Sequence, residues 1–226
     1  MKLFFYSAWI FCFFCLSAFA EEEILGELDR VLRNAHIGVT FNEFISVHPE
    51  AVYSDIDIRD MPVSLERPGA LLLSHDSDPF LGMASYANIG FREGTLYELV
   101  AVWNGESSVV KNMGGRFFAA AISRHGQTYL RKTILVYPHT AEERPVAVAM
   151  WQESDAAILA FYTPASSTDA PSKATLTYAQ FMPDDLFLKD IFEKNLPTAE
   201  QQEEAWLLLE SIMPVLEVGN GTQQQP

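Results

Sequence analysis

Cysteine is almost absent from this sequence, and where it occurs matters more than how often. Of the 226 residues only two are cysteines, Cys12 and Cys15, and both precede residue 21. Residues 21–226 therefore form no disulfide and carry no thiol for catalysis or metal binding. A fold in that region must be stabilised by packing and hydrogen bonds, without covalent cross-links.

Basic residues are also scarce. Lys and Arg total 15 against 30 Asp and Glu, which gives a formal net charge of −15. Such a chain repels phosphate backbones, and no cluster of Lys or Arg overrides the repulsion, so nucleic acid is excluded as a partner. A basic protein partner, a cation or plain solubility remain as explanations of the acidic surface.

Long apolar runs are absent after residue 20, whereas Leu3 to Leu16 form one such run near the start. Lys2 precedes this run, and the small residues Ala18 and Ala20 follow it, which predicts a signal peptide cleaved after Ala20. The alternative is an uncleaved amino-terminal anchor. Because secreted eukaryotic domains of this size usually carry disulfides, the cysteine-free remainder favours a periplasmic or secreted bacterial protein with no later membrane span.

Catalytic and metal-binding motifs are missing as well. Ser74-His75-Asp76 contains the letters of a triad, but consecutive strand residues point in opposite directions, and no Gly-x-Ser-x-Gly motif occurs. The carboxylates of residues 55–60 and 75–78 lack the spacing of a calcium loop or a zinc site. The sequence therefore predicts no catalytic residue, no metal ligand and no cofactor.

The pattern of apolar residues predicts an α+β fold. A helix is predicted over 24–32, and a short helix that Thr40 and Glu43 cap follows it. A third helix opens at Gly114-Gly115 and ends at His125-Gly126. Two C-terminal helices are predicted, one over 184–195 and one that Thr198 caps together with Gln201. A hairpin turn is expected at Glu93-Gly94. Strands are predicted over 52–58, 70–75, 85–92, 95–103, 129–137, 146–151, 156–162 and 175–181.

The predicted elements repeat in the same order. Phe41, Ile45, Ser46 and His48 recur at one constant offset as Phe118, Ile122, Ser123 and His125. This indicates a duplicated unit of one helix and four strands, with one continuous α+β domain as the alternative. The expected organisation is a signal peptide over 1–20, units over 21–110 and 111–182, C-terminal helices over 183–216 and a disordered tail over 217–226.

A family resemblance follows from the same residues. The segment Ile37-Gly38-Val39-Thr40-Phe41-Asn42-Glu43-Phe44, which leads into His48-Pro49-Glu50-Ala51, resembles the helix-then-meander module of the beta-lactamase-inhibitor-like and SmpA-like envelope proteins. The segment that ends at His125-Gly126-Gln127-Thr128 looks like a second copy. The resemblance implies an antiparallel sheet with helices packed on one face, and proteins that bind other proteins through the open face. It implies no catalytic residues.

Strand alternation predicts which side chains line that open face. In 85–92, Ala87, Ile89 and Phe91 form an apolar row, and Tyr86, Asn88 and Arg92 point the other way. In 146–151 the row of Val146 suits packing against a helix, which leaves Trp151 on the opposite face. Neighbouring strands are expected to add to that face Trp103, Arg131, Tyr162 and Tyr178. Aromatic residues and Arg are enriched at binding hot spots. The predicted binding residues are Tyr86, Asn88, Arg92, Arg131, Trp151, Tyr162 and Tyr178. Alternatively, the rings, above all those of Trp103 and Trp151, fill a core closed by the terminal helices.

The paired histidines His48 and His125 are each expected at the end of a helix. There a charged imidazole complements the helix dipole, and this capping role is favoured over metal binding or catalysis.

Together these patterns favour an exported, non-catalytic bacterial envelope protein that binds another envelope or secreted protein through an open sheet face. The alternative is an exported hydrolase with a site assembled from scattered polar residues. A deep polar pocket with converging Asp, Glu or His would favour the enzyme, and a shallow aromatic face would favour the binding protein.

Overall fold

The fold is seen in a computed structural model that describes residues 35–49, 52–53, 71–75, 81–136, 144–165, 173–183, 185–193 and 196–213. The predicted signal peptide, the helix over 24–32, the tail over 217–226 and most of the acidic segments 55–60 and 75–78 lie outside the described residues.

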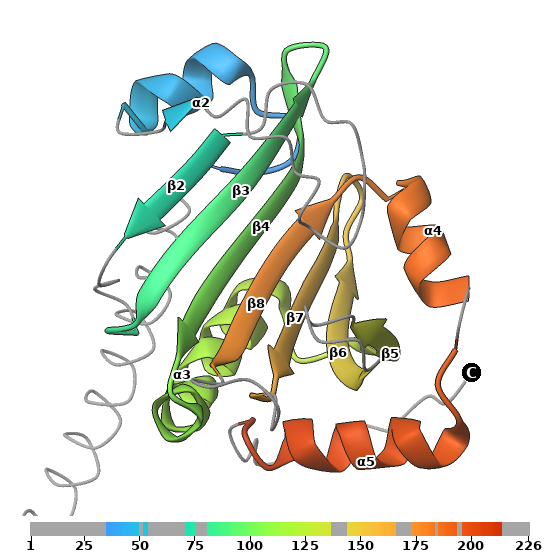
Figure 1. Cartoon of the computed structure of the whole chain (residues 1–226). Coiled ribbons are helices and arrows are strands. Elements are labelled where there is room, and N and C mark those ends of the chain that lie inside the picture. The colour runs from blue at the N-terminus through green and yellow to red at the C-terminus, as the bar shows by residue number, and fades with distance from the viewer. Residues whose placement is uncertain are drawn as a thin grey trace, which may run out of the picture.

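In the described part of the chain, eight strands form one antiparallel sheet, and its strand order is β1-β2-β3-β4-β8-β7-β6-β5 (Figure 1). Each half of the chain makes a meander, and the halves join where β4 pairs with β8. The strands are β1 (Val52–Tyr53), β2 (Leu71–His75), β3 (Ala84–Arg92), β4 (Thr95–Gly105), β5 (Leu130–Val136), β6 (Arg144–Gln152), β7 (Ala157–Thr163) and β8 (Ala174–Phe181).

Local signals in the sequence place most of these elements correctly. Thr40 and Glu43 form a capping box at the start of α2 (Phe41–Val47), and Thr198 and Gln201 form another at α5 (Ala199–Glu210). The turn between β3 and β4 has positive φ at Glu93 (52°) and Gly94 (79°), the conformation of a tight hairpin. The α+β fold class is confirmed. Along the chain, one helix followed by four strands occurs twice, and the duplication of one unit stays a prediction.

One helix begins earlier than predicted. The structure places α3 at Ser107–His125, so Gly114 and Gly115 lie in its interior instead of opening it. Gly114 is buried against Ile212, which follows α5, and a Cβ at Gly114 would overlap the Ile212 side chain. The glycine therefore serves helix packing and not helix initiation. The expected start of the second unit, residue 111, falls inside α3.

The two faces of the sheet are covered by different helices. We call the face that carries Ala101 and Tyr178 the α3 face, because residues of α2, α3 and α5 share one hydrophobic core with it, and α3 crosses behind the sheet in Figure 1. The opposite face, called the α4 face, has a second core that includes Leu188 of α4 (Leu186–Glu193).

The expectation that all helices lie on one face therefore holds for α3 and α5 but not for α4. The physical reason is that strands such as β6 and β7 are apolar on both faces, so each face requires a cover. The apolar row Val146, Val148 and Met150 packs in the hydrophobic core on the α4 face, as predicted for a row that packs against a helix. Within the described residues, no helix is long and apolar enough to cross a membrane.

Candidate functional site

The seven predicted binding residues do not form one surface. Residues paired across neighbouring antiparallel strands point to the same face. Tyr178 pairs with Ala160, and Arg131 pairs with Ala149, which itself pairs with Ala160, so Arg131 and Tyr178 share the α3 face. By the same register Trp151 and Tyr162 lie on the α3 face, whereas Tyr86 and Asn88 lie on the α4 face.

The predicted open aromatic face is wrong, because its rings are buried. Trp151 and Tyr162 are each 3% exposed and Tyr178 is 0% exposed, since α3 and α5 cover the face that carries them. The alternative role of Trp103 and Trp151 as core residues is confirmed. The indole nitrogen of Trp151 donates a hydrogen bond of 2.8 Å to the carbonyl of Gly126, which fixes the C-terminal end of α3 to β6.

The remaining predicted residues differ in accessibility. On the α4 face Asn88 is buried and Tyr86 is half-buried, and burial raises the pKa of the Tyr86 hydroxyl. Arg92 is exposed, and its guanidinium lies 4.7 Å from the centre of the Tyr97 ring. Arg131 is also exposed, but it contacts α5, because it pairs with Glu210 at 3.1 Å and lies over Trp206 at 4.2 Å.

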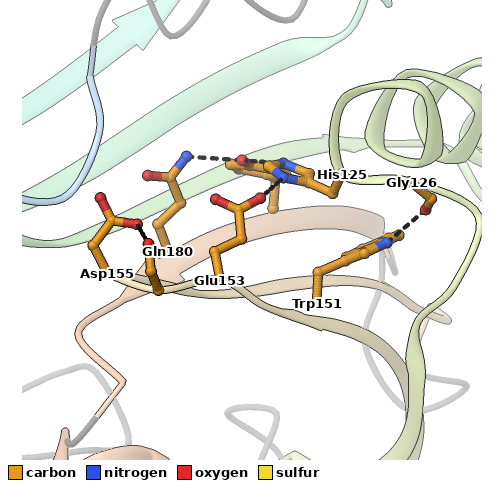
Figure 2. A network of polar contacts seen from close by, with 8 residues as sticks. His125, Gly126, Trp151, Glu153, Asp155 and Gln180 are labelled. Atoms are coloured by element: carbon orange, nitrogen blue, oxygen red, sulfur yellow. Dashed lines mark hydrogen bonds and ion pairs between the residues drawn. The ribbon is translucent and has the colours of Figure 1, made fainter.

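A polar network at the C-terminal end of α3 is the most concentrated chemistry among the described residues. His125 extends from the last turn of α3, Glu153 lies in the turn between β6 and β7, and Gln180 lies on β8 (Figure 2). Tyr178 precedes Gln180 by two residues in the same strand. Because Tyr178 and Gln180 are two residues apart in a strand, they point to the same face.

The hydrogen bonds of this network have one consistent direction. The Glu153 carboxylate accepts from Nδ1 of His125 at 2.6 Å, so the ring carries its proton there. Nε2 of a neutral ring then accepts from the hydroxyl of Tyr178 at 2.9 Å. That hydroxyl in turn accepts from the amide nitrogen of Gln180 at 2.7 Å. The arrangement fits the neutral form of His125.

The electrostatics of the network agree with this assignment. Burial lowers the pKa of His125, although the hydrogen bond and the charge of Glu153 act in the opposite direction. Burial also raises the pKa of Tyr178 to about 12, despite its hydrogen bond from Gln180. Near neutral pH, His125 is uncharged and Tyr178 keeps its proton.

The two histidines of the repeated segment lie at helix ends as predicted, but they belong to separate clusters. His48 is the C-terminal cap residue of α2, and its ring stacks on Phe44 with 4.5 Å between ring centres. The capping role predicted for His125 depends on a charged ring. Since burial keeps His125 neutral, its ring instead connects α3 to β8 and to the β6–β7 turn.

A pocket of about 200 Å³ opens beside this network. Its lining combines side chains from the segment before α2, the end of α3, the β6–β7 turn and β8. These residues are His36, Ile37, Arg124, His125, Glu153, Asp155, Ala156, Ile158 and Gln180. Among the described residues, no group of three or more His, Cys, Asp or Glu side chains is arranged to hold a metal ion.

Comparison of the chain with protein-family models, with curated proteins and with solved structures finds no match. The activity of the site must therefore be argued from its own geometry.

That geometry does not fit acid–base catalysis. The converging His, Glu and Asp side chains meet one criterion for an enzyme, but both ring nitrogens of His125 are already in hydrogen bonds with Glu153 and Tyr178. In a carboxylate–histidine–hydroxyl arrangement the histidine activates the hydroxyl bonded to it, which here is that of Tyr178. Tyr178 does not line the pocket, and its raised pKa makes the hydroxyl a poor nucleophile. The network therefore acts as a rigid connection between three elements.

Sequence reasoning missed Glu153, Asp155 and Gln180 as pocket residues. A signal for one of them was present, because Gln180 is an amide on the strand face that otherwise carries Ala174, Leu176 and Tyr178. Glu153 and Asp155 gave no such signal, since acidic residues in a turn are ordinary.

The edge of the sheet at β5 is a second candidate site. β5 is the terminal strand and pairs with β6, and no other described segment pairs with its outer edge. Leu130 is 49% exposed at the start of this strand, and Arg131 and Lys132 are exposed beside it. Ile134 points into the core of the α4 face and anchors the strand.

Proposed function

We propose that this chain is an exported, non-catalytic protein that binds an extended segment of a protein partner along the outer edge of β5. Export rests on the predicted cleavage after Ala20 and the absence of cysteine from residues 21–226. The observation that supports the binding mode is the seven-residue strand at the end of the sheet, whose outer backbone groups have no partner among the described residues.

Burial of the aromatic residues moves the proposed interface from the face of the sheet to its edge. The resemblance implies binding through an open face, but α3 and α5 cover the α3 face and α4 contributes to a core on the other. An edge strand offers a row of N–H and C=O groups that a second chain can pair with. The proposal keeps Arg131 as a binding residue and gives up Trp151, Tyr162 and Tyr178.

The backbone alone does not supply enough free energy for this association. Each new hydrogen bond contributes about 0.5–1.5 kcal/mol net, and association itself opposes binding by at least about 4 kcal/mol. Side-chain contacts must therefore add to the strand pairing. Burial of Leu130, which is half exposed, is the clearest source, because burying a leucine fully contributes roughly 1.5–3 kcal/mol.

Site-specific photo-crosslinking tests the proposal in the native envelope. A benzophenone amino acid at Leu130 is expected to give a discrete crosslinked species. The same substitution at Val109 of α3 is the matched control, since the two side chains are 49% and 42% exposed. Equal crosslinking at both positions, or none at Leu130, would contradict binding at the β5 edge.

Proline substitution then separates binding from folding. Arg131→Pro and Lys132→Pro are compared because adjacent residues of an edge strand direct their N–H groups alternately inward and outward. One variant should lose stability through the pairing with β6. The other should keep its stability but lose the crosslink from Leu130. Retention of the crosslink in the stable variant would refute strand pairing.

A further inference from the structure

The pocket beside His125 has an excess of negative charge. Its ionised side chains are Glu153 and Asp155 against Arg124, and burial lowers the pKa of His125 so that its ring adds no charge near neutral pH. Arg124 is already engaged in an interaction within the protein. The charge that the pocket offers to a ligand is therefore negative, within a chain whose formal net charge is −15. Such a site favours a cation over an anion.

Gln180 provides an independent indication of the ligand. Its side chain is only 3% exposed and lines the pocket. The amide nitrogen donates to Tyr178, and the carbonyl oxygen lies on the side away from that bond (Figure 2). Within the described part of the chain, this carbonyl oxygen accepts no hydrogen bond. An acceptor on an almost wholly buried side chain that lines the pocket favours a ligand that brings a hydrogen-bond donor.

The free polar groups of the pocket are mainly acceptors. Asp155 is exposed, and one of its carboxylate oxygens accepts from the hydroxyl of Ser154 at 3.5 Å, which leaves the other oxygen. Glu153 likewise uses one oxygen for His125 and keeps the other. Together with the Gln180 carbonyl, these groups match a ligand that carries several N–H donors and a positive charge. Ile37, Ala156 and Ile158 add apolar surface for a short hydrocarbon chain.

From these features we infer that the pocket binds a primary ammonium group, with its N–H donors directed to Gln180, Asp155 and Glu153 and its carbon chain on the apolar lining. A volume of about 200 Å³ limits the ligand to a short aliphatic amine or the end of a lysine side chain. Both sources present the same ammonium chemistry. This site is separate from the β5 edge and does not depend on the proposed partner.

Titration of the full chain with simple amines tests the inference by calorimetry and by NMR shifts of residues around the pocket. n-Butylammonium should bind, and tetramethylammonium, which has the charge but no N–H donor, should bind at least tenfold more weakly. Equal affinity of the two cations would overturn the donor-specific site. So would an absence of n-butylammonium binding up to roughly 10 mM, the range of weak affinities.

Two pocket variants and one control identify the residues. Asp155→Asn keeps a residue that favours turns and should weaken n-butylammonium binding at least tenfold. Glu203→Gln removes the same charge from an exposed position of α5 and should change the affinity less than twofold. Gln180→Met tests the buried carbonyl and should also weaken binding tenfold. Equal effects of Asp155→Asn and Glu203→Gln would show a nonspecific charge effect and overturn the site.

The source of the ammonium group is decided by comparing n-butylammonium with a blocked Gly-Lys-Gly peptide. Tighter binding of the peptide assigns the site to a lysine of a polypeptide, and tighter binding of the free amine assigns it to a small molecule. Failure of both ligands overturns the inference and leaves crosslinking at Leu130 unaffected, so the two proposals fail separately.

Discussion

Substitution of the adjacent glycines of α3 should have opposite effects on stability. Gly114 is buried, and a Cβ there would overlap the Cγ2 methyl of Ile212. At Gly115 the nearest atom to an added Cβ is the Ile212 carbonyl oxygen at 3.8 Å, an ordinary contact. The two positions share one helix, so the comparison isolates packing from helix propensity.

The magnitudes follow from two opposing contributions. Alanine in a helix interior is favoured over glycine by about 1 kcal/mol, whereas overpacking a filled site costs about 1–3 kcal/mol. The overlap at Gly114 is severe, so the cost of overpacking there lies near the upper end of that range. Gly115→Ala should therefore raise the free energy of unfolding by up to about 1 kcal/mol, and Gly114→Ala should lower it by about 2 kcal/mol.

Urea denaturation monitored by tryptophan fluorescence measures both variants. Ile212→Ala is itself destabilising, by roughly 2–5 kcal/mol, but it removes the side chain that Gly114→Ala would strike. In that background Gly114→Ala should become stabilising, as Gly115→Ala is in the native chain. If Gly114→Ala is as stable as Gly115→Ala in the native background, the close packing of α3 on Ile212 is wrong.

Two further predictions concern the network around His125. Tyr178→Phe leaves the amide of Gln180 and Nε2 of His125 without their shared partner and should lower the free energy of unfolding by about 1–3 kcal/mol. Tyr162→Phe, which removes a long hydroxyl contact of 3.4 Å in an equally buried setting, should cost less, and equal losses in urea denaturation would contradict the network. Burial lowers the pKa of His125 below its ordinary 6.5, so the unfolded chain takes up a proton at this ring before the folded chain does as pH falls. The stability that the neutral buried ring contributes is therefore complete above pH 6.5 and decreases below it. The difference in unfolding free energy between pH 7.5 and pH 5.5 should be smaller in His125→Gln, and an unchanged difference would refute the buried neutral ring.

Local chemistry explains which parts of the fold were predictable from the sequence. A capping box such as Thr40 with Glu43 is formed by residues three positions apart, and the turn at Glu93-Gly94 requires only the conformational freedom of its own backbone. Strand alternation likewise placed Arg131, Trp151, Tyr162 and Tyr178 on one face of the sheet, as the strand register confirms. These features depend on neighbours in the chain, so the sequence was sufficient for them.

The candidate site depended on contacts between distant segments. Whether the face that carries Trp151 is open or closed is decided by α3 and α5, and the close packing of α3 on Ile212 requires Gly114, whose role no local pattern reveals. Likewise, His125, Glu153 and Gln180 meet only because α3, the β6–β7 turn and β8 converge at one end of the sheet. The sequence determines the elements and the faces of their strands, but long-range packing decides which faces are covered and which polar side chains share a pocket.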